Sequence, residues 1–140
     1  MARYPSPDAF VSEVLDYRHA DRAATLCALV NWLVTLSGNG PHIAQQSNLE
    51  RWAKDARPGE HAALRISGFG LAGFQYLRML FGANTTKPDI HICRFVASCV
   101  RHSVSDLEAL QLPERAALEA GISLRDLDTT IWESSARGTC

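Results

Sequence analysis

The sequence predicts an all-α protein folded as a compact orthogonal helical bundle. Apolar residues recur at helical spacing along most of the chain, and capping residues, prolines and glycines separate these stretches. No stretch is a convincing strand, and no segment repeats another. The chain has 140 residues, of which 46% are hydrophobic and 21% are charged. This balance suits a single domain that spans residues 1–140.

Two helices are predicted at the N-terminus. Ser6 can cap the first of them, whose apolar face consists of Phe10, Val11, Val14 and Leu15. The second helix runs from about Asp21 to Leu36, and the turn Ser37–Pro41 ends it. Its apolar stripe consists of Leu26, Leu29, Val30, Leu33 and Val34.

Two more helix starts are predicted before the first glycine-rich turn. Ser47 and Glu50 have the spacing of a capping box, in which each side chain bonds the main chain of the other residue. The helix that follows this box carries Trp52 on its apolar face. Pro58 follows a break in the pattern and suits the first turn of the next helix.

The last third of the chain predicts three more helix boundaries. Ser105 and Glu108 form a second capping box. Pro113 can open a short helix that ends at Gly121. Ser123 can cap a last helix, whose inward residues are Leu124, Leu127 and Ile131. We also expect three tryptophans to lie in the core, namely Trp32, Trp52 and Trp132.

The charge balance restricts the partners of the chain. The formal net charge of −1 counts against strong non-specific binding to nucleic acid, which a basic domain usually provides. Only Lys54 and Lys87 are lysines, so almost all basic residues are arginines. Arginine suits bidentate contacts with phosphates, and it suits buried ion pairs equally well. A local basic face is compatible with this net charge.

The chain lacks the patterns of membrane and disulfide-bonded proteins. Its longest apolar run, Leu26–Leu36, contains Asn31 and is too short to span a bilayer. The N-terminal residues contain no apolar signal core, so we expect a cytoplasmic protein without a membrane partner. The cysteines are scattered without a CxxC pair and are expected to be reduced thiols; they are Cys27, Cys93, Cys99 and Cys140.

The stretch Leu64–Arg94 contains a glycine turn between two predicted helices. Gly68 and Gly70 flank Phe69, and the second helix starts at about Leu71. Glycine adopts positive φ without strain and lets the backbone approach another surface closely. The free N–H groups of a helix start form an anion site. This turn is therefore a candidate phosphate site, and a plain connection between two helices is the alternative.

A carboxylate opens the third helix of this stretch. The string Pro88-Asp89-Ile90-His91-Ile92-Cys93-Arg94 places Asp89 at the helix start, about twenty residues after the glycine turn. A fixed negative charge suits a transition state that develops positive charge. The alternative is that Asp89 only caps the helix. His91 and Arg94 are interpreted as structural or phosphate-facing residues rather than catalytic ones.

Together these residues resemble the helix-hairpin-helix–Gly/Pro/Asp superfamily of base-excision DNA glycosylases over about Leu64–Cys140. The resemblance implies double-stranded DNA as the partner, with His91 and Arg94 facing it. It also implies that Asp89 faces a flipped nucleotide, where it stabilises the oxocarbenium-like sugar as the base departs or orients the attacking water. The hairpin would bind a DNA phosphate through its main chain, in some members with a monovalent cation; its residues are Gly68, Phe69, Gly70, Leu71, Ala72 and Gly73.

Two departures from this family limit the expected chemistry. Ala72 stands where the bifunctional members have a lysine, so no Schiff base forms and a monofunctional glycosylase without lyase activity is expected. The endonuclease III-like branch carries four cysteines near its C-terminus, and here Cys140 resembles the approach to the first of them. The other three cysteines of that set are not in the sequence, and such a cluster needs four thiolate ligands, so no iron-sulfur cluster is expected. No metal is expected at Cys93, Cys99 and His102 either, because three groups at this spacing are weak evidence for a metal site and the cysteines suit an ordinary apolar face.

The segment before the hairpin is shorter than in this family. The turn after Leu36 is a hypothetical wedge loop, in which polar side chains fill the hole left by a flipped base. Those side chains are Asn39, His42, Gln45 and Gln46. Solvated loop residues are the alternative.

Three hypotheses on function follow from the sequence. The first is a compact monofunctional DNA glycosylase. The second is a non-catalytic helix-hairpin-helix module that binds DNA or protein and has lost a complete base pocket. The third is a homo-oligomer in which a second copy supplies the missing wall. The base that is recognised is not predicted, because its pocket residues lie outside the recognisable motifs.

Overall fold

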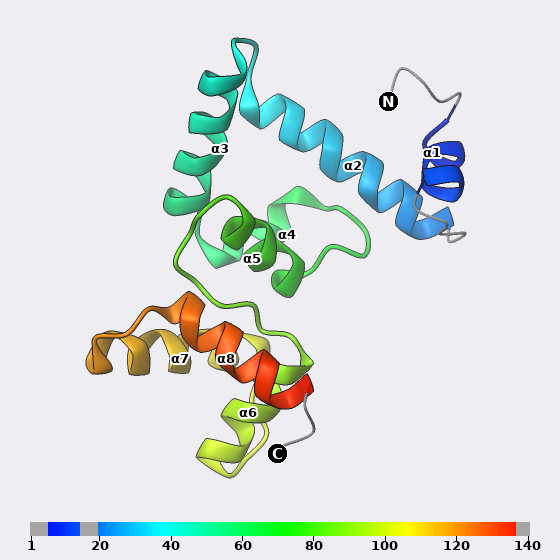
Figure 1. Cartoon of the computed structure of the whole chain (residues 1–140). Helices are drawn as coiled ribbons and strands as arrows, with labels where there is room; N and C mark the ends of the chain where they lie inside the picture. Colours follow the sequence, from blue (N-terminus) through cyan, green and yellow to red (C-terminus); the bar gives the residue numbers. More distant parts are fainter. Residues whose placement is uncertain (1–5, 15–19, 137–140) are drawn as a thin grey trace.

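In the computed structural model of the chain, the described residues are 6–14 and 20–136, and they form eight α-helices, one 3₁₀ helix and no strand (Figure 1). The predicted all-α class is therefore confirmed. The helices are α1 (Pro7–Val14), α2 (Ala20–Ser37), α3 (His42–Asp55), η1 (Pro58–Glu60), α4 (His61–Leu64), α5 (Leu71–Leu80), α6 (Ile90–Val100), α7 (Asp106–Ala120) and α8 (Leu124–Ala136).

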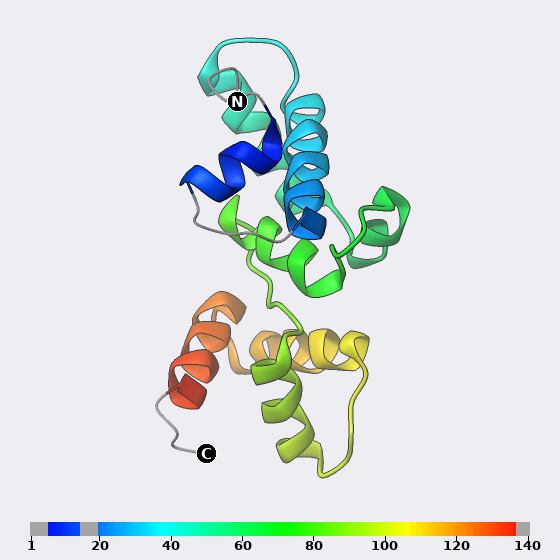
Figure 2. The ribbon, with the colours of Figure 1, turned by 90° about the vertical axis from the view of Figure 1, so that its right-hand side faces the viewer.

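The helices form two groups along the long axis of the molecule (Figure 2). In the first group α2 packs against α1 and α3, and α3 packs against α5. In the second group α6, α7 and α8 pack against one another. Residues 81–89 connect the two groups as an irregular segment (Figure 1).

Each group has its own apolar centre. In the first group the ring centroid of Trp52 lies 5.1 Å from that of Trp32 and 5.7 Å from that of Phe74. In the second group Ile92 and Val96 pack against Ile131, and partly buried Val104 and Leu127 cover them. Burial of such side chains is worth about 1.5–3 kcal/mol each.

The helix α3 begins six residues earlier than the first capping box predicted, since its N-cap residue is Pro41 and not Ser47. Ser47 lies within α3 and its Oγ donates a hydrogen bond to the carbonyl oxygen of Ile43, so Ser47 caps nothing. The turn before α3 stops α2 instead, since Gly38 has a φ of +73° and Pro41 precedes the helix. Gln45 Nε2 holds this turn by donating to the carbonyl oxygen of Gly38 at 3.1 Å.

Other boundaries follow the sequence more closely. The amide of Ala9 donates to Ser6 Oγ at 3.1 Å, which confirms the cap of α1; Leu15 lies outside the described residues. Three apolar predictions are wrong, because Val14 on α1, Val34 on α2 and Trp132 on α8 are 48%, 62% and 47% exposed. The exposure of Trp132 matters for the site described below.

The helix α7 starts at its predicted capping box and passes through a proline. Ser105 and Glu108 bond each other's main chain as predicted, and Gly121 ends the helix with a φ of +67°. The prediction that Pro113 opens a separate helix is wrong, because α7 continues through it. Pro113 is buried together with Ala109 and the other apolar residues of that face, and this packing offsets the lost main-chain hydrogen bond.

The last helix also follows the prediction. Ser123 Oγ accepts a hydrogen bond from the amide of Asp126 at 3.4 Å. Leu124 and Ile131 are buried and Leu127 is partly buried, so the predicted inward face is confirmed.

Candidate functional site

The segment before the glycine turn is less helical than the sequence predicts. After the 3₁₀ turn η1, the helix α4 spans only His61–Leu64 and ends at Arg65, which has a φ of +50°. This left-handed conformation is unfavourable for a side chain with a Cβ atom. The first helix of the expected hairpin is therefore a single α-turn, and the hairpin motif remains a prediction.

The glycine turn itself has the conformation that its residues permit. Gly68 has a φ of +75°, and a Cβ atom there would lie 3.1 Å from Thr25 Oγ1. The same hydroxyl donates to the carbonyl oxygen of Ser67 at 2.7 Å and so ties the turn to α2. A Cβ atom on Gly73 would lie 3.0 Å from the ring of Phe69, so the ring packs directly over that glycine.

The start of α5 has no side-chain cap. Gly70 is the N-cap residue in an extended conformation, and among the described residues no side chain bonds the first amides of the helix. Gly68 and Gly70 are exposed, and nothing lies within 4 Å of a Cβ atom built on Gly70. The backbone can therefore be approached here from solvent.

Asp89 caps α6 as the sequence predicts. Its Oδ1 accepts hydrogen bonds from the amides of His91 at 2.9 Å and Ile92 at 3.1 Å, and its Oδ2 pairs with Nζ of Lys87. Burial by itself raises the pKa of Asp89, but Lys87 and the two amides together hold that pKa below its usual value. The carboxyl group is therefore ionised at neutral pH, and both of its oxygens are engaged.

A cavity of about 640 Å³ lies between α5 and α8. We call it the α5–α8 cavity. It is lined by Ala72, Gly73, Tyr76, Met79 and Leu80 from α5, by Lys87, and by Arg125, Asp128, Thr129 and Trp132 from α8. Tyr76 and Trp132 are each about half exposed, with relative accessibilities of 49% and 47%. A volume in this range accommodates a small organic ligand.

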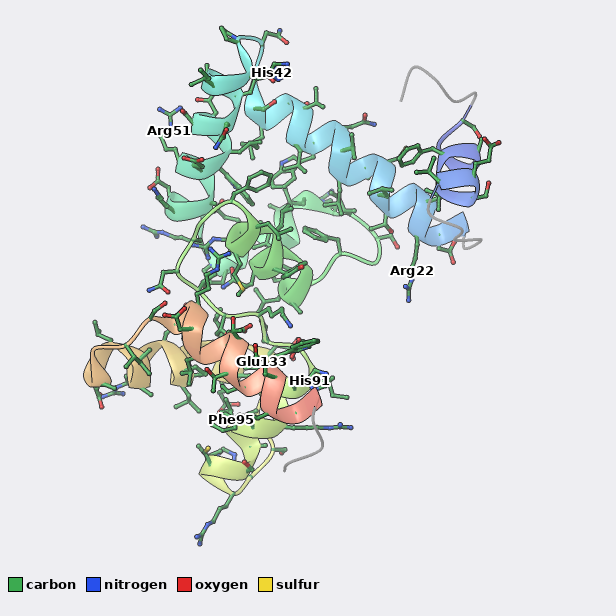
Figure 3. All side chains as sticks on the ribbon, in the orientation of Figure 1. Arg22, His42, Arg51, His91, Phe95 and Glu133 are labelled. Carbon is green, nitrogen blue, oxygen red and sulfur yellow. The ribbon has the colours of Figure 1, made fainter. Side chains whose placement is uncertain are left out.

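The cavity unites only part of the predicted site. Ala72 and Gly73 line it, whereas Asp89 adjoins it through the ion pair with Lys87. The lining does not include four predicted hairpin residues, namely Gly68, Phe69, Gly70 and Leu71. It does not include His91 or Arg94 either, which lie on α6 with His91 partly buried and Arg94 exposed. Figure 3 shows His91 beside Phe95 on this helix.

Of the cavity lining, the sequence predicted only Ala72 and Gly73 as site residues, and the missed residues include Asp128, Tyr76 and Trp132. Asp128 lies four residues after Leu124 and three before Ile131, so it occupies the predicted inward face of α8. A carboxylate on such a face is a detectable signal, because a buried charge needs specific partners. Tyr76 and Trp132 carried no comparable signal, since aromatic residues at helical spacing are usually core residues.

Side chains fix the connection that leads to Asp89. Asn84 Oδ1 accepts hydrogen bonds from Ser123 Oγ at 3.2 Å and from the amide of Arg125 at 3.1 Å. Asp128 Oδ1 accepts hydrogen bonds from Thr86 Oγ1 at 2.5 Å and from the amide of Lys87 at 3.1 Å. The start of α8 therefore holds the segment that carries Lys87.

A buried polar network holds the other side of this connection. Arg78 Nε donates to the carbonyl oxygen of Ala53 at 2.9 Å, and Arg78 Nη1 donates to Gln75 Oε1 at 2.8 Å. Gln75 Nε2 donates to Thr85 Oγ1 at 2.8 Å, and Thr85 Oγ1 donates to Glu114 Oε1 at 3.4 Å. Burial lowers the pKa of Arg78 and raises the pKa of Glu114. The network links α3 and α5 to α7.

The hypothetical wedge residues lie far from this cavity. Only Asn39 remains in the turn, whereas His42, Gln45 and Gln46 belong to the first turns of α3. That corner lies at the end of the molecule remote from α6, α7 and α8 (Figures 1 and 2), and Figure 3 marks it by His42. The expectation that His42, Gln45 and Gln46 lie in a loop is therefore wrong, whereas their role in filling the hole left by a flipped base stays a prediction.

The described residues contain no group of three or more His, Cys, Asp or Glu side chains that could hold a metal ion. Cys27, Cys93 and Cys99 are free thiols, and Cys140 lies outside the described residues. Burial raises the pKa of Cys93, and nearby Asp106 adds to this. A monovalent cation at the glycine turn remains a prediction. Among the described helices, none is long and apolar enough to cross a membrane.

The helices and the cavity define an all-α protein whose candidate site lies between α5 and α8. The chain belongs to the family DUF8548, a domain of unknown function, whose sequence pattern matches residues 28–136. No curated protein and no solved structure matches the chain.

Proposed function

We propose that this protein binds double-stranded DNA and acts on a base turned out of the duplex, as a monofunctional DNA glycosylase with Asp89 as its carboxylate. The observation that carries the proposal is the α5–α8 cavity. Its wall combines the start of α5, the Lys87 side chain that pairs with Asp89, and two half-exposed rings, Tyr76 and Trp132. Aromatic rings stack on nucleobases, so this wall suits a flat ring.

The glycine turn supports the DNA contact. Gly68 and Gly70 are exposed, and the first amides of α5 have no side-chain cap. Backbone amides at a helix start favour a phosphate, and glycines let that phosphate come close. Ala72 and Gly73 lie in the first turn of the same helix and line the cavity, so a strand held at the glycine turn passes near the cavity mouth.

The chemistry assigned to Asp89 is electrostatic. The bond between C1′ of the sugar and the base nitrogen breaks, and its electron pair leaves with the base. Water then adds its oxygen to C1′ and gives a proton to the departing base or to solvent. Positive charge develops on the sugar, and an ionised carboxylate stabilises it. Oδ2 of Asp89 becomes available when the flexible side chain of Lys87 moves its Nζ to a phosphate.

The experiment is single-turnover base release from duplexes that carry alkylated, oxidised, deaminated or mismatched bases. Asp89→Asn keeps an Oδ1 acceptor for the two α6 amides and removes the charge, so it tests the charge alone. We expect release to fall on the order of 100-fold. Glu108→Gln is the matched control, because it makes the same chemical change in the capping box of α7 and should release base normally.

One observation favours a second candidate, a non-catalytic DNA-binding module. Both oxygens of Asp89 are already engaged, by two amides and by Lys87, as expected of a purely structural cap. This candidate predicts no base release from any duplex, together with duplex binding that weakens as salt rises. If the protein shows no base release and no salt-sensitive duplex binding, both candidates are contradicted.

A further inference from the structure

Asp128 is a buried carboxylate on the wall of the α5–α8 cavity. The residue is 3% exposed, and it lies on the inward face of α8 between Leu124 and Ile131. Most positions of such a face are apolar, and a charge there needs compensation. The protein supplies hydrogen-bond donors to one of its two carboxylate oxygens.

The two oxygens of Asp128 have different surroundings. Oδ1 accepts both the hydroxyl of Thr86 and the amide of Lys87, which fixes the orientation of the carboxylate. Oδ2 accepts no hydrogen bond from the described residues. Every side-chain oxygen of these residues that is sealed from solvent has a hydrogen-bond partner. Because Oδ2 has none, it is open to solvent. Asp128 lines the α5–α8 cavity, and Oδ2 is the oxygen of its carboxylate that has no partner among the described residues.

The rings of the cavity are placed to present a flat ligand to this oxygen. Trp132 follows Asp128 by four residues on α8, so the two side chains share a face of that helix. Tyr76 belongs to the facing wall on α5, and Nζ of Lys87 lies 6.0 Å from its ring centroid. A ring that stacks on Trp132 therefore has one edge near Asp128.

We infer that Oδ2 of Asp128 selects the ligand of this cavity by accepting a hydrogen bond from the exocyclic amino group at the edge of a heteroaromatic ring. An ionised carboxylate is only an acceptor. A ring with an amino group at that edge satisfies it, whereas a ring with a carbonyl oxygen leaves two acceptors facing each other without water. The substrate class is an amino-bearing purine, and the link to DNA rests on the proposed function.

Asp128→Asn replaces the acceptor Oδ2 on the cavity wall with a donor NH₂ group and hardly changes the shape of the side chain. The amide of Lys87 is only a donor, so it keeps the Asn oxygen at the Oδ1 position. The Asn NH₂ group then replaces Oδ2 and donates into the cavity. The variant should therefore prefer a ring that presents a carbonyl oxygen. A preference that inverts differs from a general loss of binding, which misfolding would also cause.

The test is titration of the whole chain with adenine and with hypoxanthine, followed by the indole N–H signal of Trp132 in NMR spectra. Trp132→Phe assigns that signal. We expect the wild type to bind adenine at least about tenfold more tightly, and Asp128→Asn to bind hypoxanthine more tightly. Asp126→Asn is the matched control, because it makes the same chemical change at an exposed position in the first turn of α8 outside the cavity lining, and it should keep the wild-type preference.

A second arm presents the same two bases as unpaired nucleotides in a duplex. A preference for adenine in either arm supports the inference, and the arm that shows it identifies the source as free base or DNA. Equal affinities, a wild-type preference for hypoxanthine, or no binding in both arms would overturn it. The comparison of adenine with hypoxanthine in the wild type tests the inference even if Asp128→Asn fails to fold.

The two proposals fail separately. Base preference that inverts in Asp128→Asn, without base release from any duplex, supports the role of Asp128 and contradicts the glycosylase. Base release with an unchanged base preference in Asp128→Asn supports the glycosylase and overturns the role of Asp128.

Discussion

The glycine turn before α5 and the connection before α6 are held by different means. Within residues 65–70, the only side-chain hydrogen bond from another described element is the 2.7 Å bond from Thr25 to the carbonyl oxygen of Ser67. Within residues 84–89, the side chains of Asn84, Thr85, Thr86 and Asp89 all form hydrogen bonds. The turn is mostly exposed, whereas Thr85 and Thr86 are 2% and 1% exposed.

This difference separates two kinds of contact that a DNA-binding site needs. The exposed turn offers main-chain groups that a phosphate can reach, and small residues are sufficient for that purpose. The buried connection fixes the position of a charge, and a fixed charge acts without reorganisation during a reaction. Substitutions in the connection should therefore change stability most, and substitutions in the turn should change binding most.

The largest loss of stability is expected for Asp128→Ala. The change leaves the hydroxyl of Thr86 and the amide of Lys87 buried without an acceptor, at about 1–3 kcal/mol each. The free energy of unfolding should fall by about 3 kcal/mol in urea denaturation. Asp126→Ala removes an exposed carboxylate from the first turn of the same helix and should cost about 0.5 kcal/mol. Equal losses in both variants would contradict the buried anchor.

A smaller loss is expected for Gly68→Ala in the turn. The residue has a φ of +75°, and the new Cβ atom would lie 3.1 Å from Thr25 Oγ1. The backbone strain alone is worth about 1–2 kcal/mol. Thermal unfolding should show this loss, and Gly68→Asn should recover part of it because asparagine tolerates the left-handed conformation better. A neutral Gly68→Ala would show that the turn adapts.

The sequence predicted these two regions unequally. The cap at Asp89, the box at Ser105 and Glu108 and the stop at Gly121 were predictable, because each uses a local hydrogen bond or a backbone angle that one residue type favours. Pro113 was misjudged because the burial of α7 against its neighbours outweighs the local effect of a proline.

The candidate site was less predictable than the helices. Lys87 and Asp128 come together over 41 residues, and Tyr76 and Trp132 over 56 residues, so no local pattern joins them. The box at Ser47 failed because Pro41 and the turn at Gly38 start α3 earlier. The charge of Asp128 on an otherwise apolar face was the one signal in the sequence that pointed to the cavity.

The next effect is the loss of the cap at Asp89, and it depends on pH. Asp89→Ala should lower the free energy of unfolding by about 1 kcal/mol, whereas Asp89→Asn keeps the cap and loses only the charge. The folded-state pKa of Asp89 is lowered, so its charge stabilises the fold fully above about pH 4. This contribution is lost as pH falls through the lowered pKa. In urea denaturation at several pH values, the difference in free energy of unfolding between wild type and Asp89→Asn should therefore shrink as pH falls. A difference that does not change with pH would show that it does not come from the charge of Asp89.

The smallest change in stability is expected for Gly70→Ala, and this makes it the most selective test of the turn. Gly70 has a φ of −92°, which alanine adopts freely, and a Cβ atom there meets nothing within 4 Å. The free energy of unfolding should change by less than about 0.5 kcal/mol.

If a phosphate approaches the main chain at this turn, the added methyl group stands in its path and duplex affinity should fall roughly tenfold without a change in fold. Duplex binding measured by fluorescence anisotropy at constant salt gives the comparison, with Gly59→Ala as the control because that position is equally open and lies outside the turn. Equal affinities of Gly70→Ala and wild type would place the DNA contact, if there is one, away from the start of α5.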